Sequence, residues 1–214
     1  MQPTTRTPEE ALLQPYLAPA PVLAIISGPS GVGKDSVIQG LRSQQMAFHF
    51  VVTCTTRPIR EGEREGIDYY FMDEAEFERK IAADEMLEHT RVYGAYKGSE
   101  RSRIRTALAS GLDVIMRVDV QGTATIKAKV PGCITIFIAP PSLEVLRQRL
   151  EQRGADSPSQ LQRRLETAWH EIACSADFDY IVTNHEGRLP ETVDAVKAII
   201  RGARYRTGRQ PIEL

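Results

Sequence analysis

Continuous apolar runs recur along the chain and are separated by longer, mostly polar segments. They occupy Val22–Ser27, Leu112–Val120, Cys133–Ala139 and Asp179–Asn184. A continuous apolar run bounded by glycine, proline or polar residues is typical of a strand that is buried on both faces. These four runs therefore predict the central strands of a parallel sheet.

Helical periodicity fills most of the segments between these runs. Leu143, Leu146 and Leu150 fall on one face of a predicted helix, and Pro158 suits the first position of the next one. The expected helices begin near Asp35 and cover about 141–154, 157–173 and 190–206. Strands alternating with helices predict an α/β fold, with a parallel sheet covered by helices on both faces.

Residues 53–110 do not follow this alternation. Their first part is rich in Thr, Arg, Gly and Tyr, after which Asp73 and Glu76 stand at the spacing of a capping box. We expect a substrate-binding insertion here. The predicted division is an extension at 1–20, core at 21–52, 111–146 and 171–214 with a C-terminal helix, the insertion at 53–110 and a lid at 147–170.

Composition narrows the possible partners. The 214 residues carry a net charge of −1, which disfavours a sequence-independent nucleic-acid binder because such proteins need a basic field. No apolar run approaches the length of a membrane span, so we expect no membrane partner. The three cysteines are scattered, which predicts reduced thiols and a cytoplasmic location. We expect a monomer or a weak homo-oligomer.

The stretch SGPSGVGKDS is the strongest chemical signal in the chain. A glycine loop between a strand and a helix turns backbone N–H groups toward an anion, and its lysine reaches the β- and γ-phosphates of a nucleotide. The alternative is a chance glycine-rich turn, which the flanking strand and helix disfavour. The predicted ATP-binding residues here are Gly28, Pro29, Ser30, Gly31, Val32, Gly33, Lys34, Asp35 and Ser36.

Two groups of arginines are further candidates for phosphate binding. Arg57 and Arg60 suit bidentate binding of a phosphate, although a solvated charged loop explains the same segment. Arg149, Arg153 and Arg164 flank a short polar turn, where a mobile arginine segment would neutralise charge that develops during phosphoryl transfer. An ordinary basic helix face is the alternative for this second group.

Taken together, these segments resemble the guanylate kinase family. The resemblance runs from Val22 to Arg206 and rests on SGPSGVGK, TTRPIREGE, GIDYYF, EMLEHTRVYGAYKGS, VDVQG, FIAPPS, RLEQRG and DYIVTN. It implies a P-loop kinase fold with inserted GMP-binding and lid subdomains. The implied reaction transfers the γ-phosphoryl group of Mg·ATP to GMP, and also to dGMP, giving ADP and a guanosine diphosphate.

The resemblance also implies residue roles. Glu88 would accept hydrogen bonds from the guanine N1–H and amino group. GMP binding is assigned to Thr53, Arg57, Arg60, Tyr69, Glu88, Lys97, Ser99 and Asp119. Lys34, Arg149, Arg153 and Arg164 would clamp the phosphates, and Asn184 would join the ATP site. The resemblance places Asp119 beside the Mg²⁺ cofactor, and our own hypothesis adds Ser36 and Asp35 as residues that hold the ion, partly through water.

Three positions depart from the family pattern. Asp35 stands where Ser or Thr is usual, Arg117 where an acidic residue is usual, and Lys97 where many members have Tyr. A carboxylate beside a triphosphate needs a partner, so our hypothesis is that Asp35 pairs with Arg117 or ligates a Mg²⁺-bound water, while Ser36 supplies the hydroxyl. Lys97 is either an auxiliary contact to the GMP phosphate or a solvated lysine.

Two other functions fit parts of this pattern. One is a guanylate-kinase-like protein-interaction module without catalysis, which would not need Lys34 or the arginines of the lid. The other is a P-loop kinase that acts on a different small phosphorylated substrate. The combination of Arg57, Arg60, Tyr69 and Glu88 favours a guanine nucleotide.

Overall fold

A five-stranded parallel sheet forms the core of the computed structural model, which describes residues 7, 17, 19–92, 94–152 and 158–214. The strand order is β2-β7-β1-β8-β9, and every neighbouring pair is parallel. The strands are β1 (Leu23–Ser27), β2 (Phe48–Phe50), β7 (Asp113–Arg117), β8 (Ile134–Ala139) and β9 (Tyr180–Thr183). Because all five run the same way, their carboxyl ends meet at one edge, where ligands bind in such sheets.

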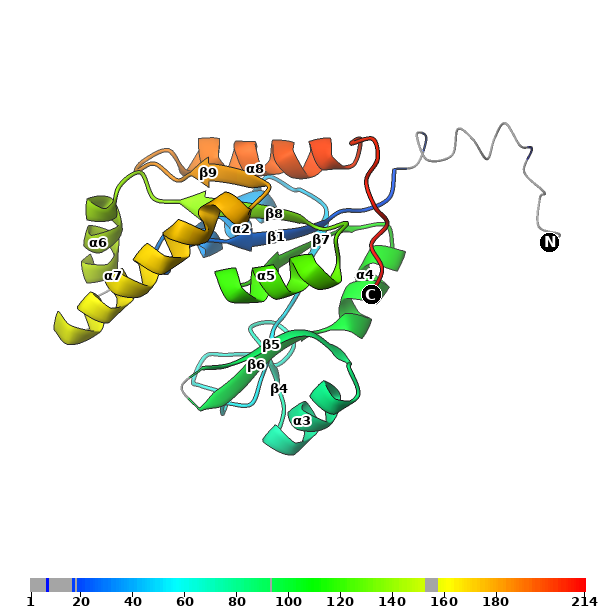
Figure 1. The fold of residues 1–214 in the computed structure, drawn as a ribbon, viewed down its shortest axis with the longest axis horizontal. Coiled ribbons are helices and arrows are strands. Elements are labelled where there is room, and N and C mark those ends of the chain that lie inside the picture. The colour runs from blue at the N-terminus through cyan, green and yellow to red at the C-terminus, as the bar shows by residue number, and fades with distance from the viewer. Residues whose placement is uncertain (1–6, 8–16, 18, 93, 153–157) are drawn as a thin grey trace.

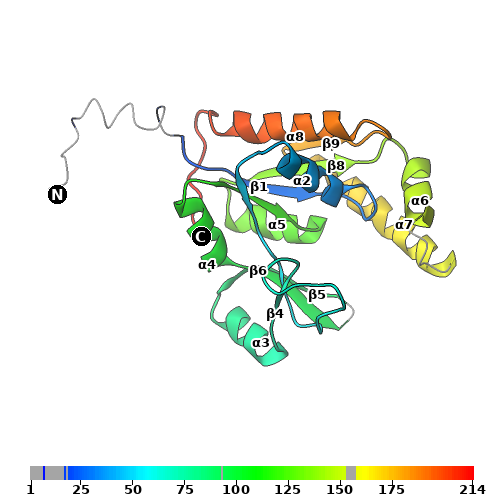
Figure 2. The same ribbon diagram turned by 180° about the vertical axis from the view of Figure 1, so that it is seen from behind.

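Helices cover both faces of this sheet, as Figures 1 and 2 show. On one face, α2 (Lys34–Ser43) and α8 (Leu189–Ala203) pack against β1 and its neighbours. On the other face, α4 (Arg101–Ala109) and α5 (Val120–Lys129) complete a second hydrophobic cluster. The predicted α/β class, with helices on both faces of a parallel sheet, is confirmed.

One predicted central strand is too long, while the other three agree with their observed bounds to within one residue at each end. The strand expected over Leu112–Val120 ends at Arg117, because Asp119 caps α5. Its Oδ1 accepts a hydrogen bond of 2.7 Å from the N–H of Gly122. The edge strand β2 was not predicted, since three half-buried residues show no periodicity.

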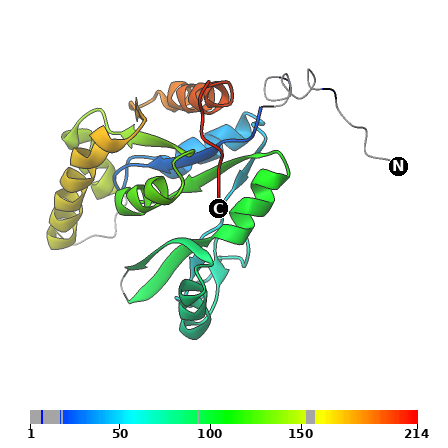
Figure 3. The same ribbon diagram turned by 45° about the vertical axis from the view of Figure 1, so that its right-hand side comes forward.

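A second sheet lies below the core in Figure 3. Its strand order is β4-β3-β6-β5, and α3 (Glu74–Ala82) packs beside it. Its strands are β3 (Cys54–Thr55), β4 (Tyr70–Phe71), β5 (Met86–Val92) and β6 (Ala95–Glu100). The predicted cap of α3 is present, because the N–H of Glu76 donates to Asp73 Oδ1 at 2.7 Å. This unit, residues 54–100, is called the insert below.

Helices α6 (Leu143–Gln152) and α7 (Pro158–Ala173) form a third unit beside the sheet (Figure 1). They pack through Leu146, Leu150 and Ala168, and a 3₁₀ turn at Cys174–Asp177 leads from α7 to β9. Arg153 lies outside the described residues. No described helix has both the length and the apolar character that crossing a membrane requires.

Candidate active site

The glycine loop follows β1 at the carboxyl edge of the sheet. Gly28 and Gly33 have φ values of 136° and 99°, a region that side chains disfavour. A Cβ at Gly28 would lie 2.3 Å from the carbonyl oxygen of Ile138, and one at Gly33 would lie 2.6 Å from Asn184 Nδ2. Both glycines are therefore required by backbone conformation and by close packing. The loop ends at the N-terminus of α2, which favours a bound anion.

Lys34 is the first residue of α2, and its side chain lies over the loop. Its Nζ donates to the carbonyl oxygens of Gly28 and, at 3.0 Å, of Pro29. Carbonyl groups thus hold the ammonium group at the mouth of the anion site. This is the position from which the lysine of a glycine loop reaches nucleotide phosphates.

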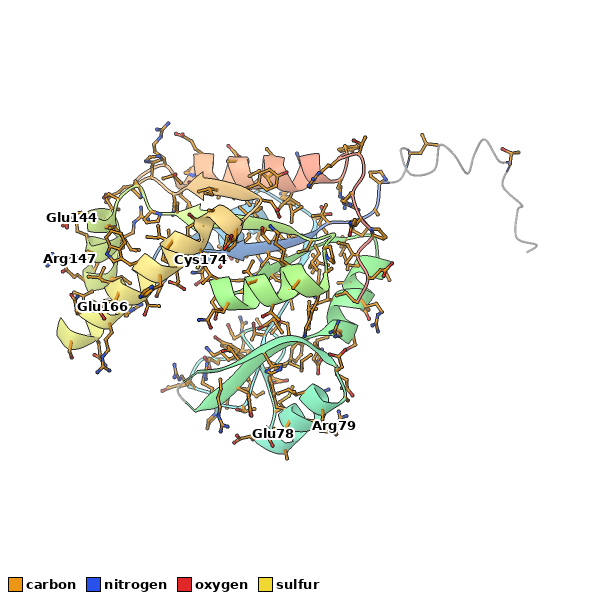
Figure 4. All side chains as sticks on the ribbon, in the orientation of Figure 1. Glu78, Arg79, Glu144, Arg147, Glu166 and Cys174 are labelled. Carbon is orange, nitrogen blue, oxygen red and sulfur yellow. The ribbon has the colours of Figure 1, made fainter. Side chains whose placement is uncertain are left out.

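Two of the predicted lid arginines contact the glycine loop. Arg149 on α6 donates to the carbonyl oxygen of Asn184 at 3.0 Å and to that of Val32 at 3.4 Å. Arg164 on α7 donates to Ser30 Oγ at 2.8 Å. Figure 4 shows Glu144 and Arg147 on the outer side of α6, away from this contact. Arg149 and Arg164 therefore point inward to the loop.

A cavity of about 350 Å³ adjoins the glycine loop on the side of α6 and α8. Asn184 lines it but is only 6% exposed, because its Nδ2 donates to the carbonyl oxygen of Val32 at 2.8 Å. Its side chain thus holds the glycine loop in place. The cavity is lined by Gly31, Val32, Gly33, Ser36, Arg149, Gln152, Asn184, His185, Glu186, Gly187 and Leu189, and is called the donor cavity below.

A second cavity, of about 220 Å³, lies between the core and the insert. It collects side chains from both units, because Lys34 comes from α2 and Glu88 from β5. Its lining is Lys34, Thr53, Tyr69, Glu88, Thr90, Lys97, Gly98, Arg117, Val118 and Asp119. Five residues predicted to bind GMP are among these, and we call this space the acceptor cavity.

Glu88 provides a carboxylate inside the acceptor cavity. It is 5% exposed, pairs with Ser99 across β5 and β6, and accepts a hydrogen bond of 2.8 Å from Ser99 Oγ. Burial raises the pKa of Glu88 to about 7, with the negative charge of Asp119 adding to the effect and the Ser99 hydrogen bond opposing it. A ligand that offers two hydrogen-bond donors would stabilise the ionised form of this carboxylate.

Arg57 and Arg60 do not line the acceptor cavity; they occupy the loop beside it. Arg57 forms an ion pair with Glu63 and lies over the ring of Tyr69, 4.8 Å from its centroid. The backbone N–H of Arg60 also donates to Glu63, at 2.9 Å. The hydrogen bond from Arg57 lowers the pKa of Glu63 to about 2. Glu63 therefore organises this arginine loop around a charge that persists at neutral pH.

The two departures at positions 35 and 117 form one ion pair. The guanidinium group of Arg117, at the end of β7, donates to Asp35 Oδ1 in the first turn of α2. This arrangement confirms the pairing alternative of the hypothesis. The unusual carboxylate is neutralised by the unusual arginine.

The oxygen ligands predicted for Mg²⁺ are spread around the glycine loop. Ser36 lines the donor cavity, Asp35 binds Arg117, and Asp119 Oδ1 caps α5. Within residues 19–92, 94–152 and 158–214, no three His, Cys, Asp or Glu side chains are arranged to hold a metal ion. This donor set fits an ion that nucleotide phosphates and water hold, which is the usual state of Mg²⁺ in kinases.

Three residues of the site were missed in the sequence. Thr90 lines the acceptor cavity, two positions after Glu88 on the same face of β5. Gly122 lies beside Glu88 and lets α5 begin close to Val118 of the acceptor cavity, since a Cβ there would lie 2.7 Å from Val118 Cγ1. Burial raises the pKa of Glu171 on α7, although the charge of Lys34 and the N–H of Ser30 oppose the shift. Seven-residue spacing from Arg164 could have placed Glu171 on the face of α7 that meets the loop.

Comparison with known proteins agrees with this geometry. The Guanylate kinase family model matches residues 21–203. A guanylate kinase from Symbiobacterium thermophilum is 40% identical over 191 residues, covering 89% of this chain and 90% of that protein. "Guanylate kinase 2, chloroplastic/mitochondrial" from Oryza sativa is 41% identical over 197 residues, which cover 92% of this chain and 69% of the relative.

A solved structure is similar as well. The crystal structure of guanylate kinase from Anaplasma phagocytophilum superposes with a TM-score of 0.69 at 31% sequence identity. The match covers 89% of this chain and 90% of that one. The match to the family model spans the glycine loop, the insert and the lid helices. The chain belongs to the guanylate kinase family, whose members are ATP:GMP phosphotransferases.

Proposed function

We propose that this chain transfers the γ-phosphoryl group of Mg·ATP to GMP and dGMP in the acceptor cavity. One observation carries the proposal: a buried carboxylate, Glu88, shares this cavity with Lys34 of the glycine loop. Guanine presents two donors on one edge, which suit a carboxylate, whereas adenine presents an acceptor at N1. The cavity thus matches a guanine base at one end and transferring phosphates at the other.

The reaction needs alignment and charge stabilisation more than proton transfer. An oxygen of the GMP phosphate attacks the γ-phosphorus, the bond from that phosphorus to the β–γ bridging oxygen breaks, and ADP leaves with the electron pair. The attacking phosphate is already anionic, so no general base is required. Lys34, Arg149 and Arg164 would hold the phosphates in line and compensate their charge. We assign the same role to Arg153.

Mg²⁺ fits the oxygen donors of the site. We propose that Ser36 and Asp119 hold the ion, partly through water, while Asp35 acts on it at most indirectly because Arg117 occupies its carboxylate. When bound, Mg²⁺ neutralises charge on the nucleotide phosphates. Asn184 would keep the glycine loop shaped for ATP, and Arg57, Arg60, Tyr69 and Lys97 would surround the GMP phosphate.

A coupled assay of ADP release tests the function. Mg·ATP is supplied with GMP, dGMP, AMP, CMP or UMP as acceptor. We expect turnover with GMP and dGMP only, since the assigned residues bind the guanine base and the phosphate, which these two acceptors share. Turnover with another small phosphorylated acceptor would overturn the guanine assignment. A folded protein that binds GMP but turns over none of the five would support a non-catalytic interaction module.

A further inference from the structure

Arg117 stands where the donor and acceptor sites meet. It is the last residue of β7, next to the glycine loop in the parallel sheet, and its side chain lines the acceptor cavity with Lys34 and Lys97. Its ion-pair partner, Asp35, belongs to the helix that carries the donor loop. The pair therefore links the two phosphate sites across the carboxyl edge of the sheet.

The burial of the two partners is unequal. The side chain of Arg117 is 32% exposed, whereas that of Asp35 is 66% exposed. An ion pair with so exposed a carboxylate contributes little to stability, so stability alone is a weak reason for the arrangement. A guanidinium group has more N–H donors than one carboxylate oxygen uses, and the Arg117 side chain that donates to Asp35 also lines the acceptor cavity.

We propose that Arg117 is a phosphate-binding residue that contacts the phosphoryl group between donor and acceptor, and that Asp35 is the positioning residue that aims it. This inference rests on the proposed kinase function. Arg117 differs from Arg149 and Arg164 because a core strand carries it, while α6 and α7 carry the other two. It holds a cation at the transfer point whatever the position of the lid.

The same strand offers a matched control at its opposite end. Asp113, the first residue of β7, forms an ion pair of 2.9 Å with Arg204, whose side chain is 28% exposed. This pair joins β7 to the end of α8, and neither partner lines the donor or the acceptor cavity. A purely structural role for Arg117 predicts that the two arginines behave alike when they are replaced.

The test compares Arg117→Met, Arg117→Lys, Asp35→Asn and Arg204→Met in the full chain. We expect Arg117→Met to lower kcat about 100-fold with KM for ATP nearly unchanged, as when one oriented donor is lost from a transition state. Asp35→Asn should lower kcat about tenfold and should have no further effect in the Arg117→Met background. Arg204→Met should lower Tm and leave kcat unchanged.

Other outcomes overturn the proposal. Wild-type kcat in both Arg117→Met and Asp35→Asn would reduce the pair to a structural contact. If Arg117→Met does not fold, Arg117→Lys tests the proposal instead. Lysine keeps the positive charge but lacks the planar guanidinium group, so kcat of this variant should still fall about tenfold. Wild-type kcat in Arg117→Lys together with Asp35→Asn would then contradict the inference.

A binding measurement separates this inference from the proposed function. The probe is adenosine joined 5′ to 5′ to guanosine through a pentaphosphate chain, which spans both sites without reacting. Arg117→Met should weaken its binding about 100-fold, and Arg204→Met should not. If the wild type lacks turnover but binds the probe, the proposed kinase function is wrong. The ratio of the probe's Kd in Arg117→Met to its Kd in the wild type then still tests whether Arg117 binds phosphate. A wild type that binds no probe contradicts both.

Discussion

The donor and acceptor sides of the active site are built on different principles. The donor side is mostly backbone: glycines in left-handed conformation, carbonyl oxygens that receive Lys34 and Arg149, and an asparagine that braces the loop. The acceptor side is mostly side chains, with Glu88 and Ser99 facing each other across two strands. A backbone site recognises any nucleotide phosphate, whereas paired side chains select one base.

The two sides also rest on hydrophobic cores of different size. The donor loop follows β1, which is fully buried between the two main clusters. The insert has a small core of its own, made of Cys54, Phe77 and Met86 with partly buried neighbours. We expect so small a core to open locally at a lower free energy than the main sheet, even though Leu87 of β5 is buried in the second main cluster and joins the insert to it. Selectivity is thus placed on the unit with the smaller core.

Glu88→Gln should give the largest effect, and on the acceptor side alone. Glutamine offers one acceptor and sets its own donors against those of guanine, so kcat/KM for GMP should fall about 10⁴-fold. Binding of a non-hydrolysable ATP analogue, measured by calorimetry, should stay at the wild-type value. The control is Glu78→Gln, the same change at an exposed position on α3 (Figure 4). If Glu88→Gln weakened the binding of the ATP analogue as much as it lowers kcat/KM for GMP, the donor and acceptor sides would not be independent.

Phe77→Ala should come next and should weaken the insert selectively. Phe77 is fully buried and stacks on Tyr96 at 5.0 Å, so its loss should cost about 3–5 kcal/mol. Hydrogen exchange should speed up in β5 and β6 and stay slow in β1 and β8. The matched change Phe137→Ala, at a fully buried residue of β8, should speed up exchange in the main sheet instead. Identical exchange patterns in both variants would mean one cooperative unit.

Acidification should weaken GMP binding by a smaller factor. The carboxylate of Glu88 must be ionised to accept from guanine, and its pKa in the free protein is about 7. The Kd for GMP should therefore rise about tenfold for each pH unit below that value. Glu88→Gln is the control, because any pH dependence left in it belongs to the phosphate of the ligand. If the Kd of the wild type changed with pH between 5 and 8 no more than the Kd of Glu88→Gln does, the prediction would be contradicted.

The same group makes folding stability depend on pH. Since the folded-state pKa of Glu88 is raised from 4.5 to about 7, its contribution to stability is fully present below 4.5 and is lost as the pH rises through 7. Glu88→Gln should remove this dependence from the wild-type curve of unfolding free energy. Urea unfolding at several pH values measures it.

The sequence was sufficient for the α/β class, for four of the five core strands and for the donor loop. These features depend on local signals, namely apolar runs and glycines at fixed spacing, which the chain shows without reference to distant residues. Strand ends and the short edge strand were predicted less well. The strand predicted over Leu112–Val120 is too long, because Asp119 near its end caps the following helix and the strand stops at Arg117. Edge strand β2 was missed for lack of periodicity.

The acceptor cavity depended on tertiary structure. Glu88 and Ser99 are eleven positions apart and meet only through the register of β5 and β6. Arg117 and Asp35 are separated by 82 positions, and their pairing was a hypothesis until the sheet set β7 beside the glycine loop. Local propensity and motif spacing thus decided which elements form and where phosphate binds. The pairing of strands decided which side chains surround the acceptor, because burial and charge neutralisation depend on neighbours that the chain brings together only when it folds.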